Sequence, residues 1–272
     1  MKMHVAEHAP GAIVLVLPAR NEEATVGTVA ERVPRTAGGR PVECIVVDDG
    51  STDGTAAVAA AAGVVVVPSP RPGLGAAVRT GLAAATARAA VAVAFCDADG
   101  EYAPEELDRL VAPILEGRAD YVVGSRFAGE VRHMRPHRAV GNRILTSLVR
   151  RRSALPVTDG QSGFRALSAA AAASAVIVHD YNYAQVLTLD LAARGFRYAE
   201  VPISYHRRRH GRSFVRLVPY LRHVLPAMWR TWPASAEEIA CEPSSSPDRR
   251  QGWARPQPPV SVPTGMRSSA SI

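Results

Sequence analysis

The chain has 272 residues and a formal net charge of +7, nearly all of it from arginine because Lys2 is the only lysine. Its 47% of apolar and 21% of charged residues exclude a wholly disordered or fibrous chain, and its length suits one large domain or two small ones. No apolar run reaches the roughly 18 residues of a membrane-spanning helix. The polar opening is unlike a secretory signal, and the three scattered cysteines suggest reduced thiols, so we expect a cytoplasmic protein.

Residues 13–123 alternate short β-rich runs with segments of helical length. The apolar runs are Ile13–Leu17, Cys44–Val47, Gly63–Val67, Val91–Phe95 and Tyr121–Val123. Such continuous runs indicate strands buried on both faces, and their alternation with helices indicates right-handed crossovers in a mostly parallel sheet. Residues 51–53 are predicted to cap a helix that ends at Ala62, and Pro104 suits the first turn of another helix. The sequence therefore predicts an α/β fold with a Rossmann-like sheet flanked by helices.

The pattern changes after Arg126. Pro136–Arg152 and Asn182–Arg194 are predicted helices, and Tyr198–Tyr205 is a predicted strand. The first helix carries a run of three arginines at residues 150–152, which suits either a solvated face or contact with anionic headgroups.

The C-terminal part of the chain is basic and apolar at first and low in complexity at its end. In Phe214–Trp232, apolar and aromatic residues alternate with arginines. This extension suits either the surface of an anionic membrane or two short helices packed on the domain. We expect residues 1–11 to be flexible, residues 12–232 to form the domain, and the Pro/Ser-rich residues 233–272 to be disordered.

Polar clusters follow three of the predicted strands. They are Pro18–Glu22, Asp48–Ser51 and Asp97–Asp99. In open α/β sheets, ligands bind beyond the carboxyl ends of the strands. Carboxylates at i and i+2 suit Mg²⁺ or Mn²⁺ and leave positions open for phosphate oxygens. A lone Asp-x-Asp triplet is more often a capped loop, but three polar clusters at one edge favour a binding site.

Six motifs then carry a family resemblance. They are Pro18-Ala19-Arg20-Asn21-Glu22, Asp48-Asp49-Gly50-Ser51-Thr52-Asp53-Gly54-Thr55, Gly73-Leu74-Gly75-Ala76-Ala77, Asp97-Ala98-Asp99-Gly100-Glu101, Gly124-Ser125-Arg126 and Asp159-Gly160-Gln161-Ser162-Gly163-Phe164-Arg165. Together they resemble the family 2 inverting glycosyltransferases of GT-A fold over about residues 13–230. The last two resemble the branch of polyprenyl- or dolichyl-phosphate sugar synthases. The resemblance implies transfer of a mannose- or glucose-type sugar from a GDP- or UDP-sugar to an acceptor, which we expect to be polyprenyl phosphate.

The resemblance also implies roles for residues on the donor side. Pro18, Arg20 and Glu22 would frame the nucleobase and ribose, and Val47 and Asp49 would contact the nucleoside. The Gly73–Gly75 loop suits either an approach to phosphate or an ordinary entry to a helix.

Further roles fall on the diphosphate. The triplet Asp97-Ala98-Asp99 would take the metal, Mg²⁺ or Mn²⁺, and the diphosphate through its two carboxylates, with Glu101 where the family often has Gln. Arg126 and Arg208 would pair with the diphosphate and stabilise its departure. The family's late basic motif has a lysine where this chain has Phe214, so Arg212 or Arg216 is its expected substitute.

Asp159 has two possible roles. A hydroxyl acceptor needs a general base, and Asp159 is then the best-placed one. A phosphate acceptor is already anionic, and Asp159 is then left to orient Arg165 or its loop, or to contact the metal, and we favour the role in the loop.

Three alternatives to the polyprenyl phosphate synthase remain open. The same donor chemistry would serve a hydroxyl of a soluble glycan or natural product. A sugar nucleotidyltransferase would need an early Gly-rich signature with Arg and Lys, which does not suit a chain with Lys2 alone. A non-catalytic membrane-surface module leaves Asp97 and Asp99 unexplained. We expect no nucleic acid partner, and a lipid acceptor would bring the enzyme to the cytoplasmic face of the membrane; the oligomeric state stays open.

Overall fold

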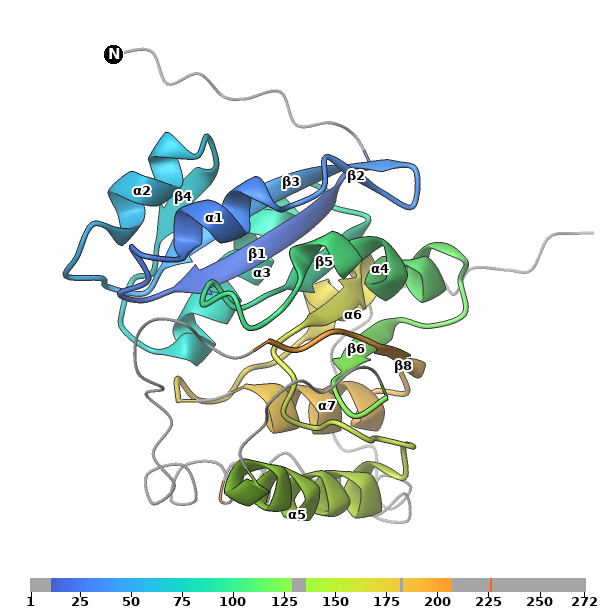
Figure 1. Ribbon diagram of the computed structural model, residues 1–272. Helices are drawn as coiled ribbons and strands as arrows, with labels where there is room; N and C mark the ends of the chain where they lie inside the picture. The colour runs from blue at the N-terminus through green and yellow to red at the C-terminus, as the bar shows by residue number, and fades with distance from the viewer. Residues whose placement is uncertain (1–10, 129–135, 182, 207–225, 227–272) are drawn as a thin grey trace, which may run out of the picture. The chain divides into compact units, whose positions relative to one another are not determined.

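The computed structural model describes residues 11–128, 136–181, 183–206 and 226, which all belong to one compact unit (Figure 1). Its eight strands form one sheet in the order β2-β3-β1-β5-β7-β6-β8, with β4 also paired to β3. The strands are β1 (Ile13–Ala19), β2 (Thr36–Ala37), β3 (Arg40–Asp48), β4 (Val65–Pro68), β5 (Ala92–Phe95), β6 (Tyr121–Ser125), β7 (Arg165–Ser168) and β8 (Tyr198–Pro202). The five strands expected before residue 126 are confirmed.

The sheet is mostly parallel, as predicted, with one reversed strand inside it. β1 pairs in parallel with β3 and β5, whereas β7 lies antiparallel between β5 and β6. Strands β1, β3, β5 and β6 therefore end at the same edge of the sheet, and β7 begins there. At that edge Arg165 pairs with Phe95 on one side and Val123 on the other.

Helices cover both faces of the sheet (Figure 1). They are α1 (Val26–Glu31), α2 (Thr55–Ala61), α3 (Leu74–Ala87), α4 (Leu107–Leu115), α5 (Pro136–Ser153), α6 (Ala169–Ser174) and α7 (Ala184–Ala193), with a 3₁₀ turn, η1 (Pro104–Glu106), before α4. Ile13, Leu15 and Leu17 of β1 pack in a core with α1 and α4, whereas Val14 and Val16 pack in a second core with α3, α6 and α7. All five are 0% exposed, which explains why β1 reads as an unbroken apolar run.

Helix α5 lies beyond α7, on the side away from the sheet (Figure 1). A small third core joins the two helices, with Val149 of α5 and Val157 packed against Val186 and Leu189 of α7. The predicted helix over residues 136–152 is thus confirmed.

Some expectations differ from the structure. Helix α2 has Gly54 as its N-cap residue, so none of the predicted residues 51–53 occupies that position. The Ser51 hydroxyl accepts a hydrogen bond from the Asn21 N–H at 3.1 Å, whereas Asp53 accepts one at 3.0 Å from the N–H of Thr55, the first residue of the helix. The helix expected from residue 182 begins at residue 184, and the strand expected up to residue 205 ends at residue 202.

The ends of the chain fall outside the described residues. The predictions for the N-terminus, for the basic extension over residues 214–232 and for the tail therefore stay predictions. Among the helices that are described, none is both long and apolar enough to cross a membrane.

Candidate active site

The ends of β1 and β3 bring the expected nucleoside residues together. The Asp49 N–H donates to the Ala19 carbonyl at 2.8 Å, and Arg20 Nη1 lies 3.9 Å from Asp49 Oδ2. Asp49 is 6% exposed, and this burial raises the pKa of its carboxyl above the ordinary value. The other oxygen, Oδ1, accepts a hydrogen bond from the Gly73 N–H at 2.6 Å. Arg20 and Asp49 thus form one charged pair at the edge of the sheet.

Other expected nucleoside residues differ in accessibility. Pro18 and Glu22 are partly exposed beside this edge, and the Glu22 N–H donates to Thr55 Oγ1 at 2.8 Å. Val47 is 0% exposed and belongs to the core under α3. A ligand would therefore meet the backbone of Val47 and not its side chain.

The glycine loop before α3 serves the packing of the protein itself. The Gly73 N–H is taken by Asp49, and the Gly75 N–H donates to the Asp180 carbonyl at 3.0 Å. A methyl group on Gly75 would lie 2.0 Å from the His179 carbonyl oxygen, so glycine is needed for this approach. The two N–H groups are engaged with protein acceptors, which favours the ordinary helix entry over a phosphate cradle.

Asp97 and Asp99 follow β5 at the same edge. Both are partly exposed, whereas Ala98 between them is 0% exposed. Asp99 Oδ1 accepts a hydrogen bond from the Glu101 N–H at 2.9 Å, which fixes that carboxylate in the loop. Within the described ranges, no group of three or more His, Cys, Asp or Glu side chains suited to a metal is found. Two carboxylates fit a Mg²⁺ or Mn²⁺ whose other ligands come from water and phosphate oxygens.

The loop before β7 lies against these carboxylates. A methyl group on Gly163 would lie 2.4 Å from Asp97 Oδ2, so the Gly163 backbone directly borders the Asp97 side chain. The Gly163 N–H donates to the Tyr102 hydroxyl at 2.8 Å. Residues 60 or more positions apart in the chain are thus held side by side.

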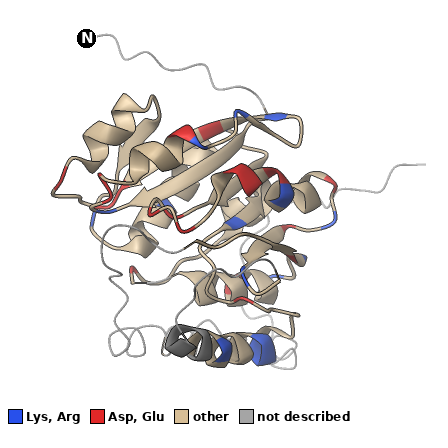
Figure 2. Cartoon of the chain, viewed as in Figure 1, with Lys and Arg blue, Asp and Glu red and all other residues tan. Residues whose placement is uncertain are grey.

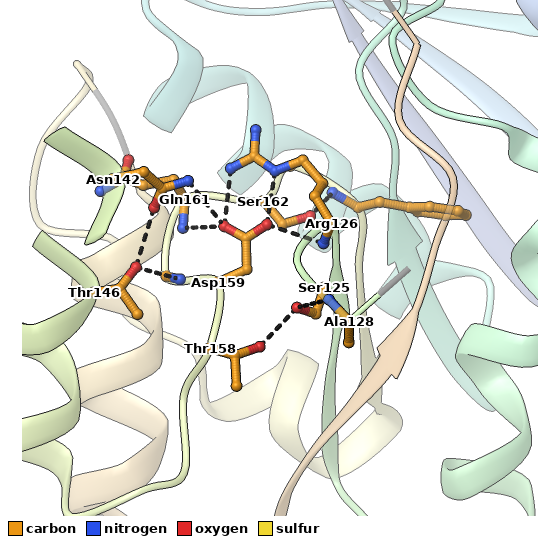
Figure 3. Close-up of polar contacts among 12 residues, drawn as sticks. Ser125, Arg126, Ala128, Asn142, Thr146, Thr158, Asp159, Gln161 and Ser162 are labelled. Carbon is orange, nitrogen blue, oxygen red and sulfur yellow. Dashed lines mark hydrogen bonds and ion pairs between the residues drawn. The ribbon is translucent and has the colours of Figure 1, made fainter. Parts of the chain in front are cut away.

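Arg126 and Asp159 form a buried ion pair beside this loop (Figure 3). Arg126 Nε lies 2.6 Å from Asp159 Oδ2, Nη2 lies 2.8 Å from Oδ1, and the Arg126 N–H adds a third bond at 3.1 Å. Oδ1 also accepts bonds from Asn142 Nδ2 at 3.3 Å and from the Gln161 N–H at 3.2 Å. Burial alone would raise the pKa of Asp159, but Arg126 and the other donors hold it below its ordinary value.

This geometry bears on both expected roles. Arg126 is 7% exposed and Asp159 is 0% exposed. A carboxylate with a lowered pKa and both oxygens engaged is a weak base, so the arrangement favours Asp159 as an orienting group. The arginine that it holds is Arg126 and not the expected Arg165, whose hydrogen-bond acceptors are carbonyls and hydroxyls. The Arg126 guanidinium also lies over the Tyr205 ring, 5.1 Å from its centroid.

Arg165 is a second buried cation, and its hydrogen-bond acceptors are all neutral. It is 0% exposed at the start of β7. The acceptors are the carbonyls of Ser162 at 2.6 Å, Gly160 at 3.0 Å and Ala184 at 2.8 Å, Thr188 Oγ1 at 2.9 Å, and the Tyr121 hydroxyl. Arg165 therefore ties residues 160–162 to β6 and α7.

Sequence reasoning missed some residues of this site. Tyr102, Asn142 and Tyr205 were not expected there. Asn142 lies 17 residues from Asp159, and no local motif signals such a contact. Arg208 lies outside the described residues, so its diphosphate role stays a prediction.

The chain has a mixed α/β sheet of the GT-A-like type, with acidic motifs at the ends of its parallel strands. The family model described as glycosyl transferase family 2 matches residues 14–174. The chain belongs to this family, which confirms the resemblance inferred from its motifs.

Relatives and solved structures agree on the family and differ in substrate. Polyprenol monophosphomannose synthase of Mycolicibacterium smegmatis is 32% identical over 213 residues, which cover 74% of this chain and 79% of the relative. A UDP-N-acetylglucosamine–dolichyl-phosphate N-acetylglucosaminyltransferase of Methanococcus voltae is 39% identical over 77 residues, or 28% and 31% of the two chains. Glucosyl-3-phosphoglycerate synthase of Mycobacterium tuberculosis, solved with Mn²⁺, UDP and glucosyl-3-phosphoglycerate, superposes with a TM-score of 0.68 at 29% identity, over 85% and 84% of the chains.

Proposed function

We propose that this protein transfers a mannose- or glucose-type sugar, with inversion at the anomeric carbon, from a GDP- or UDP-sugar to the phosphate of a polyprenyl phosphate. The nucleoside would lie along the ends of β1 and β3, against Arg20, Glu22 and Asp49. The diphosphate would lie toward Asp97 and Asp99.

Asp97 and Asp99 would hold a Mg²⁺ or Mn²⁺ together with the diphosphate. When bound, such a metal neutralises charge on a diphosphate leaving group. The solved relative was crystallised in complex with Mn²⁺ and UDP, which supports the same donor chemistry in this chain. The two side chains are partly exposed, as a ligand-binding pair must be.

Arg126 would supply a fixed positive charge at the same edge, where negative charge develops on the departing diphosphate. Two of its nitrogens donate to Asp159, so its orientation is set before the donor arrives. Arg208 is the second cation proposed for this role.

The state of Asp159 is the observation that favours a phosphate acceptor. A hydroxyl acceptor needs a base, whereas a phosphate oxygen is already anionic at neutral pH. Asp159 is fully buried, is paired with Arg126 and has a lowered pKa, so it is poorly suited to take a proton. The names of the mycobacterial and methanogen relatives point to polyprenol and dolichyl phosphate acceptors and support the same choice.

A soluble phosphorylated acceptor is the second candidate. It is favoured by the solved relative, which carries glucosyl-3-phosphoglycerate and is matched over 85% of this chain. In that reaction the sugar goes to a hydroxyl, and another group would have to act as the base.

Transfer of radiolabelled sugar distinguishes the two candidates. The protein is incubated with Mn²⁺ and a panel of GDP- and UDP-sugars, with either a short-chain polyprenyl phosphate or 3-phosphoglycerate as acceptor. We expect label in the organic-extractable lipid, dependent on the polyprenyl phosphate and absent with Asp97→Asn. Label found only in the water-soluble product would overturn the lipid acceptor and establish the second candidate.

A further inference from the structure

Helix α5 and the segment that follows it line an open pocket with a volume of about 310 Å³. It is lined by Arg143, Thr146, Ser147, Arg150, Val157 and Thr158. The four residues from α5 are spaced i, i+3, i+4 and i+7, so they lie on one face of the helix. None of the donor-site residues described above lines this pocket.

The pocket lining contains two arginines and no acidic side chain, and the carboxylate beside it, that of Glu200, is engaged by the N–H and the hydroxyl of Thr158. Within the described residues, neither Arg143 nor Arg150 has an ion-pair partner. Helix α5 contains no Asp or Glu, and its described part in Figure 2 carries blue residues and no red ones. Most of the other described arginines form an ion pair. Arg197, for example, donates two hydrogen bonds to the Asp120 carboxylate, at 2.8 and 3.0 Å.

This combination of groups suits a phosphate. A guanidinium group is planar and can donate two parallel hydrogen bonds to two oxygens of a phosphate. Ser147 is exposed between the two arginines in the sequence of α5 and adds a hydroxyl donor to the same lining.

The pocket is also connected to the buried ion pair (Figure 3). The Thr146 hydroxyl, part of the lining, accepts the Gly160 N–H at 3.1 Å and bonds to Asn142 Oδ1 at 3.0 Å. Asn142 Nδ2 donates to Asp159 Oδ1 at 3.3 Å, and Asp159 holds Arg126. One side chain therefore separates the pocket lining from the Asp159 carboxylate.

We propose that this α5 pocket is a second anion site, separate from the donor site, that binds the phosphate group of an anionic ligand through Arg143 and Arg150. A lipid headgroup and a soluble phosphate both offer this chemistry. The site goes beyond the proposed sugar transfer, and its test needs no transfer activity, so the two proposals fail independently.

The test compares two double variants that each remove two positive charges. Arg143→Gln/Arg150→Gln changes the pocket. The control, Arg35→Gln/Arg40→Gln, changes two exposed arginines on either side of β2 that likewise form no ion pair within the described residues. A third variant, Ser147→Asp, places a negative charge in the pocket. Flotation measures binding to phosphatidylcholine vesicles with and without phosphatidic acid. Binding of inorganic phosphate is measured by the rise in unfolding temperature that it causes, relative to sodium chloride at equal ionic strength.

We expect binding to phosphatidic acid vesicles to weaken at least ~10-fold in the pocket double variant, because each arginine near an anionic surface contributes roughly a 5-fold gain in affinity. Ser147→Asp should weaken it too, and the variant at residues 35 and 40 should stay near wild type. If the pocket variants lose binding to the vesicles only, the site is assigned to a lipid headgroup. If they also lose the thermal stabilisation by inorganic phosphate, the site is assigned to phosphate in general. Equal weakening in both double variants, or wild-type binding in the pocket variants, would overturn the proposal. Unchanged unfolding temperatures in chloride confirm that the variants are folded.

Discussion

On the side of β1, β3 and β5, the charged groups of the candidate site are partly or fully exposed except for Asp49, whereas on the side of β6 and β7 they are buried and held by hydrogen bonds. Asp97 and Asp99 are partly exposed, and the Arg20 side chain is 53% exposed. Arg126 and Arg165, in contrast, are 7% and 0% exposed. The first side has groups available to a ligand, and the second side fixes the positions of the groups around it.

The difference separates activity from stability. Replacing a partly exposed carboxylate by its amide removes the charge that a ligand would meet and keeps one oxygen as an acceptor, as for the Glu101 N–H at Asp99. Removing one member of a buried ion pair leaves an uncompensated charge, which typically costs about 3–5 kcal/mol. Substitutions on the two sides should therefore be told apart by unfolding measurements alone.

The largest effect is expected for Asp159→Asn. It leaves Arg126 buried without its counter-ion, so the free energy of unfolding should fall by about 3–5 kcal/mol in urea titration. The matched control is Asp120→Asn, which breaks a more exposed pair with Arg197 and should cost about 1 kcal/mol or less. Equal losses in the two variants would contradict the contrast between the buried and the exposed pair.

The same pair predicts a pH dependence. Because the native pKa of Asp159 is lowered, its contribution to stability is complete above the unfolded value of about 3.9 and is lost as the pH falls through the native pKa. The difference in unfolding free energy between wild type and Asp159→Asn should therefore be constant near neutral pH and shrink below about pH 4. A difference that grows on acidification would show that the sign is wrong.

On the open side, Asp97→Asn or Asp99→Asn should act on activity. We expect kcat/KM to fall at least ~10²-fold, about 2.7 kcal/mol of transition-state stabilisation, with an unfolding free energy close to wild type. Glu116→Gln, an exposed carboxylate paired with Arg118, is the control and should keep full activity. Full activity of the wild type in excess chelator would contradict the metal role of the two aspartates.

The sequence predicted the open side well because its signals are local. Unbroken apolar runs mark β1, β3 and β5, and the polar residues that follow each run mark the edge of the sheet at which these strands end. Parallel pairing brings these strand ends together without further information. Arg20, Asp49, Asp97 and Asp99 could therefore be named from motif and position.

The buried side depends on contacts that no short window contains. Strand β7 is only four residues long, and its Arg165 interrupts the apolar pattern, so it was not predicted. Asn142 reaches Asp159 only because α5 lies where the fold places it. The glycine loop illustrates the same limit, because the sequence left its phosphate role open and the residues that take its N–H groups include Asp180, more than 100 positions away.

Gly163, in the loop before β7, contacts Asp97 at the end of β5 and so joins the buried side to the open side. Its substitution is expected to have the smallest effect on activity of those predicted here. In Gly163→Ala the new methyl group would lie 2.4 Å from Asp97 Oδ2, so the Asp97 carboxylate must move. A displaced ligand weakens metal binding without removing it, so we expect kcat/KM to fall by about 10-fold, or 1.4 kcal/mol, at limiting Mn²⁺. Raising Mn²⁺ should restore activity in Gly163→Ala and not in Asp97→Asn, since only the first keeps both carboxylates. Gly141→Ala is the control, because nothing lies within 4 Å of its added methyl group and alanine favours the helix by roughly 0.5–1 kcal/mol. Unchanged metal dependence in Gly163→Ala would mean that the loop before β7 does not position Asp97.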